Sequence, residues 1–319
     1  MTTVTDEHGV NVNGGGDIRR FGYYVVQPNG TMDFVVHSKV ATADVLDEFH
    51  ELVRVVFRLQ PVVISLRIVE SNARDLIAVI DNHQLELNAL RTPNIVSIDA
   101  AISGLILASR GLANFLCAAT SFIELTEAQL RLGYGRESKE LASWIACRRS
   151  LHAKSFAYRF LYKLRNFSQH RSLPISNFNI SGVRDSGSGA MKFEVGIDIV
   201  RDALRASGFN WGGVGEEIAR QPSRFDVLPL VFEFLALLRT LCREVFKIEA
   251  EALAQCHRYL SVLKAKIAVP QRAVPAIFVG HSAAPDVPPM NHEVIPDAQL
   301  RWLLREYDEL VGRCDDRRI

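Results

Sequence analysis

The feature that most constrains the fold is an amphipathic segment that runs from about Leu151 to Pro174. Its apolar residues recur at the i, i+3, i+4, i+7 spacing of one stripe of an α-helix. They are Ala153, Phe156, Ala157, Phe160, Leu161, Leu164 and Phe167. The other faces carry basic and imidazole side chains, and Pro174 is expected to stop the helix. The pattern therefore predicts a helix with a buried apolar face and an exposed cationic end.

Longer helical patterns on either side predict the elements that cover this apolar face. Residues 97–132 and 226–268 carry apolar side chains at helical spacing along most of their length, and a further helix is expected to start near Ser138. Two short alternating runs predict an inserted β-hairpin at about 177–197. The predicted fold class is therefore mainly α, a helical bundle with an inserted β-hairpin plus a small α+β N-terminal region.

The two ends of the chain differ in character from the centre. Residues 21–37 predict a β-hairpin, and residues 42–59 predict a helix that Pro61 closes. Residues 62–90 fit mostly helix, with a strand as the alternative. Six prolines between residues 270 and 296 predict a loose connector before a last helix. We expect three regions, namely a hairpin-plus-helix region (1–95), a helical domain (96–268), and a Pro-rich connector with a C-terminal helix (269–319).

Composition excludes several classes of function. Of the 319 residues 48% are hydrophobic and the formal net charge is +1, so the chain can bury a core and has no overall bias toward nucleic acid. The five cysteines form no CxxC pair and no Cys/His cluster, which predicts free thiols and no metal site. Neither a dinucleotide fingerprint nor a P-loop is found, so no cofactor is expected.

The same reasoning predicts a compartment. The apolar run near Ile102–Ala108 is interrupted by polar residues and is shorter than the roughly 18 to 20 residues of a membrane span. The first residues lack the basic and apolar regions of a signal peptide. The sequence therefore predicts a cytoplasmic protein that does not contact a membrane.

A stretch without acidic residues is the strongest local charge feature. None of the 44 residues between Glu140 and Asp185 is Asp or Glu, although the stretch holds eight Lys and Arg residues. It predicts a site for an anion, most naturally phosphate or an RNA backbone, with a chance cluster on a solvated surface as the alternative. The basic residues assigned to this site are Arg148, Arg149, Lys154, Arg159, Lys163 and Arg171.

Within this stretch, Arg165 and His170 form an arginine–histidine pair with four residues between them. The pair lies at the end of the amphipathic helix, just before Pro174. An imidazolium there would also favour the helix dipole, so a capping role for His170 is the alternative. Tyr158 and Tyr162 lie beside the apolar face and are interpreted as packing residues, with base stacking as the alternative.

Arg165, the polar Asn166 and His170, at the end of a late helix, resemble the motif of the HEPN superfamily (higher eukaryotes and prokaryotes nucleotide-binding). The phrase SFAYRFLYKLRNFSQHRSLPI is also similar to uncharacterised bacterial HEPN-like proteins. The resemblance covers about residues 97–268, and the hairpin departs from the minimal fold. It implies a metal-independent endoribonuclease of toxin–antitoxin, phage-defence or stress systems. It also implies a homodimer and an antitoxin or other regulatory partner.

The implied chemistry assigns a role to each residue of the motif. An imidazole can transfer the proton of the RNA 2′-hydroxyl, which attacks phosphorus, so His170 is the proton-transfer group. Arg165 holds the phosphate with a bidentate fork, and Asn166 contacts the phosphate or orients the imidazole. On an ideal helix Arg165 and His170 lie about 140° apart. Their convergence therefore needs an unwound helix end or a second chain.

Two alternatives to a nuclease stay open at this point. One is a catalytically inactive HEPN-like module that binds RNA or a nucleotide, or that serves as a scaffold. The other is a purely structural helical bundle.

Overall fold

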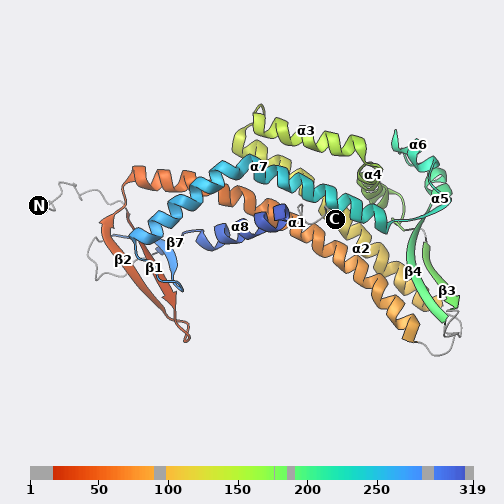
Figure 1. The fold of residues 1–319 in the computed structure, drawn as a ribbon, viewed down its shortest axis with the longest axis horizontal. Coiled ribbons are helices and arrows are strands. Elements are labelled where there is room, and N and C mark those ends of the chain that lie inside the picture. The colour runs from red at the N-terminus through yellow and green to blue at the C-terminus, as the bar shows by residue number, and fades with distance from the viewer. Residues whose placement is uncertain (1–16, 90–97, 176, 185–190, 282–290, 313–319) are drawn as a thin grey trace, which may run out of the picture. The chain divides into compact units, whose positions relative to one another are not determined.

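A computed structural model describes residues 17–89, 98–175, 177–184, 191–281 and 291–312. The described chain is mostly helical with two small antiparallel sheets (Figure 1). It forms two compact units. The first contains the residues up to Phe57 and Glu249–Glu309, and the second contains Arg58–Ile248 and the residues from Leu310. Two long helices, α1 (Ala43–Ala89) and α7 (Leu228–Lys266), contribute to both units.

The first unit is built on a four-stranded antiparallel sheet of order β2-β1-β6-β7. The predicted N-terminal hairpin is confirmed as β1 (Ile18–Val26) and β2 (Met32–Val40). Its turn contains Gly30 at φ +84°, a left-handed conformation that glycine adopts without a Cβ clash. The unit also contains α8 (Asp297–Gly312) as far as Glu309, where a last helix was expected.

The expectation of a loose connector after residue 269 is wrong in part. The structure places β6 (Val274–Gly280) against β1, and β7 (Asn291–Val294) against β6. The prolines led to the prediction of a loop, although the chain forms a short apolar strand here. Pro275 stands near the start of β6, where a missing N–H is tolerated. Ala276, Ile277 and Phe278 are buried, so the burial of this run outweighs the local loop signal.

The helix expected to end before Pro61 instead continues to Ala89, so the predicted stop is wrong. A proline inside a helix costs about 3 kcal/mol. Leu59, Val62 and Val63 flank it and are almost fully buried, and packing of this kind supplies most helical stability in proteins. The same observation resolves residues 62–89 as helix. The boundary at residue 95 lies outside the described residues.

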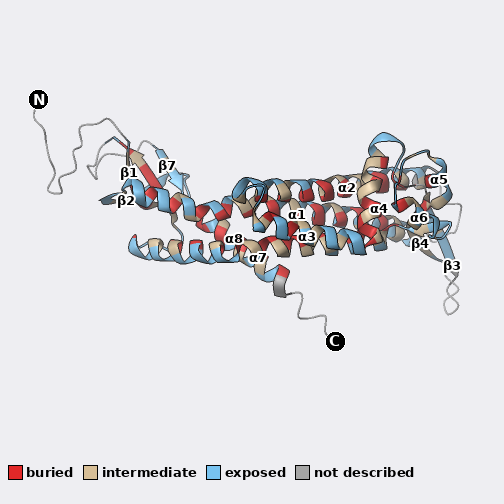
Figure 2. Ribbon diagram, turned by 90° about the horizontal axis from the view of Figure 1, so that it is seen from above, coloured by how far each residue is buried: buried red, intermediate tan, exposed pale blue. Residues whose placement is uncertain are grey.

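The second unit packs five helices around its core. They are α1 from Arg58, α2 (Ile98–Tyr134), α3 (Lys139–Lys154), α4 (Phe156–His170) and α7 as far as Ile248. Buried residues recur along the inner faces of these helices (Figure 2). The Phe115 and Phe234 rings meet edge to face at 6.3 Å between α2 and α7, so the core is aromatic where these two helices meet.

A three-stranded antiparallel sheet of order β3-β4-β5 completes the second unit. The predicted inserted hairpin is confirmed as β3 (Asn177–Arg184) and β4 (Met191–Val200). It is followed by α5 (Arg201–Ala206), α6 (Val214–Ala219) and β5 (Arg224–Asp226). Gly104 of α2 contacts the Phe178 ring of β3 so closely that a Cβ there would lie 2.5 Å from it.

Candidate functional site

The segment predicted as one helix from Leu151 is two helices that meet at Ser155. Ser155 is extended (φ −113°, ψ 121°), and its hydroxyl accepts a hydrogen bond from the Tyr158 N–H at 3.0 Å. The hydroxyl also donates to the Glu233 carboxylate of α7. This capping arrangement begins α4 and ends α3, so Ala153 lies on α3 and is exposed rather than part of the buried stripe.

The rest of the predicted apolar stripe is confirmed except for Phe156, which is only half-buried. Ala157, Phe160, Leu161, Leu164 and Phe167 are buried on α4. Beneath them lies Trp211, from the glycine-rich loop before α6. Its ring centroid is 6.0 Å from that of Phe160 and 5.3 Å from that of Phe167. One tryptophan therefore supports both ends of α4.

Arg165 and Asn166 form a local pair near the C-terminal end of α4. Arg165 Nη1 donates to Asn166 Oδ1 at 3.1 Å, which orients the guanidinium group. Arg165 Nε is buried and has no hydrogen-bond partner among the described residues. A guanidinium has five N–H donors and no acceptor, and Asn166 takes only one of them. Because the Arg165 side chain is only half-buried, its donors that reach the surface can take an acceptor from outside.

His170 is the last residue of α4 and is exposed. The helix does not unwind before it, since the first backbone bond of the cap is Arg171 N–H to the Phe167 carbonyl at 2.9 Å. Five helical residues separate Arg165 from His170, which corresponds to about 140° around the axis. The structure therefore does not bring the two side chains together within one chain, and the unwound-end route to convergence is not observed.

Arg159, predicted as a phosphate ligand, is instead held by acceptors of its own chain. Its Nε and Nη2 donate to the two carboxylate oxygens of Glu217 in α6 at 2.9 and 2.6 Å. Its Nη1 donates to the carbonyls of His152 and Ala153 at the end of α3. The hydrogen bond from Arg159 holds the pKa of Glu217 below its usual range. This guanidinium joins three helices.

Arg148 is also paired, through Glu127 of α2. Its guanidinium lies over the Trp144 ring, 5.3 Å from the ring centroid. The stretch has no acidic residue of its own, but two of its arginines pair with carboxylates from other helices, Glu127 of α2 and Glu217 of α6. Four of the predicted basic residues have no carboxylate partner within the described residues, namely Arg149, Lys154, Lys163 and Arg171.

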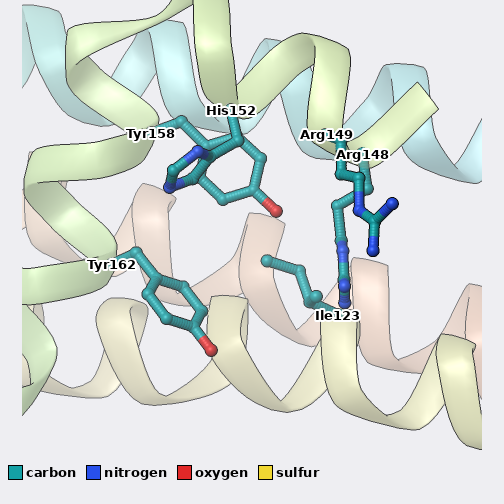
Figure 3. Close-up of a pocket in the computed structure, with 6 residues that line it drawn as sticks. All are labelled: Ile123, Arg148, Arg149, His152, Tyr158 and Tyr162. Atoms are coloured by element: carbon teal, nitrogen blue, oxygen red, sulfur yellow. The ribbon is translucent and has the colours of Figure 1, made fainter. Parts of the chain in front are cut away.

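A pocket of about 360 Å³ lies between α2, α3 and α4 (Figure 3). It is lined by Ile123, Arg148, Arg149, His152, Tyr158 and Tyr162. The rings of His152, Tyr158 and Tyr162 gather on one side, and the two arginine side chains lie on the other. The ring centroids of His152 and Tyr158 are 5.3 Å apart and those of Tyr158 and Tyr162 are 6.4 Å apart.

Burial is the main cause of the pKa shifts of two groups on the aromatic side of this pocket, and both shifts favour the uncharged form. Partial burial, followed by the charges of Arg159 and Arg148, lowers the pKa of His152 below its usual range. Burial raises the pKa of the Tyr158 hydroxyl. The site therefore offers neutral rings and a tyrosine O–H beside guanidinium groups. Sequence reasoning missed His152 and Ile123 as pocket residues. The position of His152 in the acid-free stretch was a signal that the sequence offered. Its contact with the ring of Tyr158 could be found only from the tertiary structure.

Within the described part of the chain, no group of three or more His, Cys, Asp or Glu residues is placed to hold a metal ion. Four free thiols are described, of which Cys242 and Cys256 are buried. Gln169 Nε2 lies 3.7 Å from Cys117 Sγ and connects the end of α4 to α2. The expectation that the apolar run near Ile102 is too short for a membrane span is wrong by length and composition, since residues Ala101–Tyr134 meet both criteria. Of their most apolar window, 33% is buried inside the protein.

Comparisons with protein-family models, curated proteins and solved structures give no match to this chain. Its class is therefore defined by its own fold and site. It is a mainly α-helical protein with two small antiparallel sheets, and its candidate site lies along α4.

Proposed function

We propose that this chain is a metal-independent endoribonuclease of the HEPN type that acts as a homodimer. The observation that carries the proposal is the state of Arg165. Its guanidinium is oriented by Asn166, its Nε is buried without a partner among the described residues, and no described carboxylate neutralises it. Such a group is suited to bind a phosphate and to stabilise the negative charge of a phosphoryl-transfer transition state.

The chemistry then follows from the residues of the α4 end. A base takes the proton of the RNA 2′-hydroxyl, the oxygen attacks the neighbouring phosphorus, and an acid protonates the departing 5′-oxygen. His170 is exposed at the end of the helix and is the proton-transfer group, because an imidazole can both accept and donate a proton. Arg165 binds the non-bridging oxygens. Since the two side chains diverge on α4, Arg165 of one chain and His170 of a second chain form each site.

The direct test is cleavage of RNA in EDTA by wild type and by two variants. Arg165→Ala and His170→Ala should each lower the cleavage rate at least about 100-fold, the usual range for a lost charge-stabilising or proton-transfer group. His257→Ala and Arg258→Ala are matched controls, because both residues are exposed on α7 in the first unit. Wild-type cleavage no faster than that of the two site variants would remove the nuclease proposal.

The dimer requirement has its own test. Inactive Arg165→Ala and His170→Ala proteins would be mixed and allowed to exchange subunits. If each site takes its arginine and histidine from different chains, half of the dimers regain one of their two sites, and activity returns to about a quarter of wild type. A site formed within one chain predicts no recovery.

One observation favours a second candidate, a catalytically inactive HEPN-like RNA-binding protein. The divergence of Arg165 and His170 leaves a single chain with a phosphate-binding group but no adjacent proton-transfer group. In that case Arg165→Ala weakens RNA binding, whereas His170→Ala leaves binding unchanged and wild type cleaves no RNA. Binding and cleavage measured on the same two variants separate the candidates.

A further inference from the structure

The pocket between α2, α3 and α4 adjoins the α4 end on which the proposed function rests. Tyr158, Tyr162 and Arg165 stand at i, i+4 and i+7 and so share one stripe of α4. This stripe faces α2, because Ile123 of α2 lines the pocket with both tyrosines and Cys117 of α2 contacts Gln169 further along. Arg165 lies about 4.5 Å along the axis from Tyr162. The pocket and Arg165 are therefore neighbouring sites on one helix face.

The two sides of the pocket differ in chemistry. Tyr158 is 2% exposed and its ring centroid is 5.0 Å from that of Phe234, so it is fixed as the floor. Tyr162 and His152 are less buried and leave ring surface available. The aromatic side therefore has a fixed, buried ring in Tyr158 and accessible ring surface in Tyr162 and His152. This arrangement suits a flat, uncharged ring of a ligand.

The opposite side offers positive charge of two kinds. Arg148 is held in place by Glu127 and Trp144 and forms a fixed wall. Arg149 is exposed and has no carboxylate partner within the described residues, so its guanidinium is available for an anion. An aromatic surface beside an available guanidinium group matches a nucleobase joined to a phosphate.

We infer that this pocket holds one unstacked nucleotide of single-stranded RNA, with its base against Tyr162 and His152 and its phosphate on Arg149. The inference rests on the proposed function and deepens it by naming the substrate class. A paired base cannot enter, since a duplex keeps its bases stacked inside the helix. The nucleotide in the pocket places the adjoining backbone at Arg165, one step further along α4.

The test measures RNA affinity in the absence of cleavage. His170→Ala protein would be titrated, in EDTA, into fluorescein-labelled 12-nucleotide single-stranded RNA and into the matching duplex, and followed by anisotropy. Single-stranded RNA should bind at least about fivefold more tightly than the duplex. Adding Tyr162→Ala should weaken single-strand binding at least about fivefold, the lower end of base-stacking effects. Tyr162→Phe, which keeps the ring, should change binding less than about twofold.

Arg149→Ala is the second variant, and because Arg149 is exposed it leaves the fold intact. It should weaken binding and lower the slope of log affinity against log salt by about one. Phe232→Ala is the matched aromatic control, since Phe232 is 50% exposed on α7 in the same unit. Equal affinity for duplex and single strand, or unchanged affinity in both Tyr162→Ala and Arg149→Ala, overturns the inference.

The results also separate this inference from the proposed function. If wild type cleaves no RNA but the pocket variants still weaken single-strand binding, the nuclease proposal fails and the pocket assignment stands. If wild type cleaves RNA but the pocket variants bind it as tightly as the parent, the pocket assignment fails alone.

Discussion

Two arginines six residues apart on α4 differ in their hydrogen-bond partners. Arg159 donates to both oxygens of Glu217 and to two carbonyls at the end of α3. Among the described residues, the guanidinium of Arg165 donates a hydrogen bond to the neighbouring Asn166, and its buried Nε has no partner. The first arginine fastens helices, whereas the second is available for a ligand. A basic residue is therefore assigned to structure or to binding by its partners in space and not by the charge of its sequence neighbours.

The largest expected effect is the loss of stability when Trp211, which packs against both halves of α4, is removed. Trp211→Ala should lower the free energy of unfolding by about 3–5 kcal/mol, because it removes a 6% exposed ring that packs on both Phe160 and Phe167. Urea denaturation measures the change. Trp211→Phe is the milder control and should lose less. A loss below about 1 kcal/mol for Trp211→Ala would contradict the common support.

The contrast between the two arginines predicts opposite profiles of stability and binding. Arg159→Ala should lower the free energy of unfolding by about 2 kcal/mol, since it breaks several charge-assisted hydrogen bonds at a partly solvated site. Arg165→Ala should change it by less than about 0.5 kcal/mol but should weaken RNA binding. The measurements are urea denaturation and anisotropy on both proteins. Similar stability losses in the two variants would remove the distinction.

The Ser155 cap at the boundary between α3 and α4 makes a smaller contribution to the stability of this region. Ser155→Ala removes the side-chain acceptor of the Tyr158 N–H and the donor to Glu233. The expected loss is about 1 kcal/mol, the usual cost of a deleted N-cap. Ser155→Asp keeps the acceptor but sets a second carboxylate beside Glu233, whereas Ser155→Thr keeps both functions and should retain most of the stability. Equal losses for Ala and Thr would contradict the capping role.

The smallest effect is a pH dependence. The hydrogen bond from Arg159 lowers the folded-state pKa of Glu217 below 4.5, so its stabilisation is present above that value and is lost as pH falls through the folded pKa. The difference in unfolding free energy between wild type and Arg159→Ala should therefore shrink on acidification from pH 7 to below pH 4. A difference that is constant over this range would show that the ion pair contributes nothing.

Much of the local structure follows from short-range pattern. The buried stripe of α4, the hairpin of β1 and β2, and the inserted hairpin of β3 and β4 were all predicted, because periodicity is a property of neighbouring residues. Two of the errors share one cause. Pro61 and the prolines after residue 269 are local stop signals, and each was overridden by burial against residues distant in sequence.

The site divides in the same way. The sequence by itself determined that α4 has an apolar face, a basic surface and an arginine–histidine pair at its end, because these depend only on the order of residues. Only the tertiary structure decided which charges are available, since Glu127 and Glu217 lie 21 and 58 residues from the arginines they pair with. It also gathered His152, Tyr158 and Tyr162 into one pocket. The divergence of Arg165 and His170 already followed from helical geometry, and the structure excluded the unwound helix end, because α4 stays helical up to His170. Pairing between residues far apart in the chain depends on distances in space, which a one-dimensional pattern does not contain.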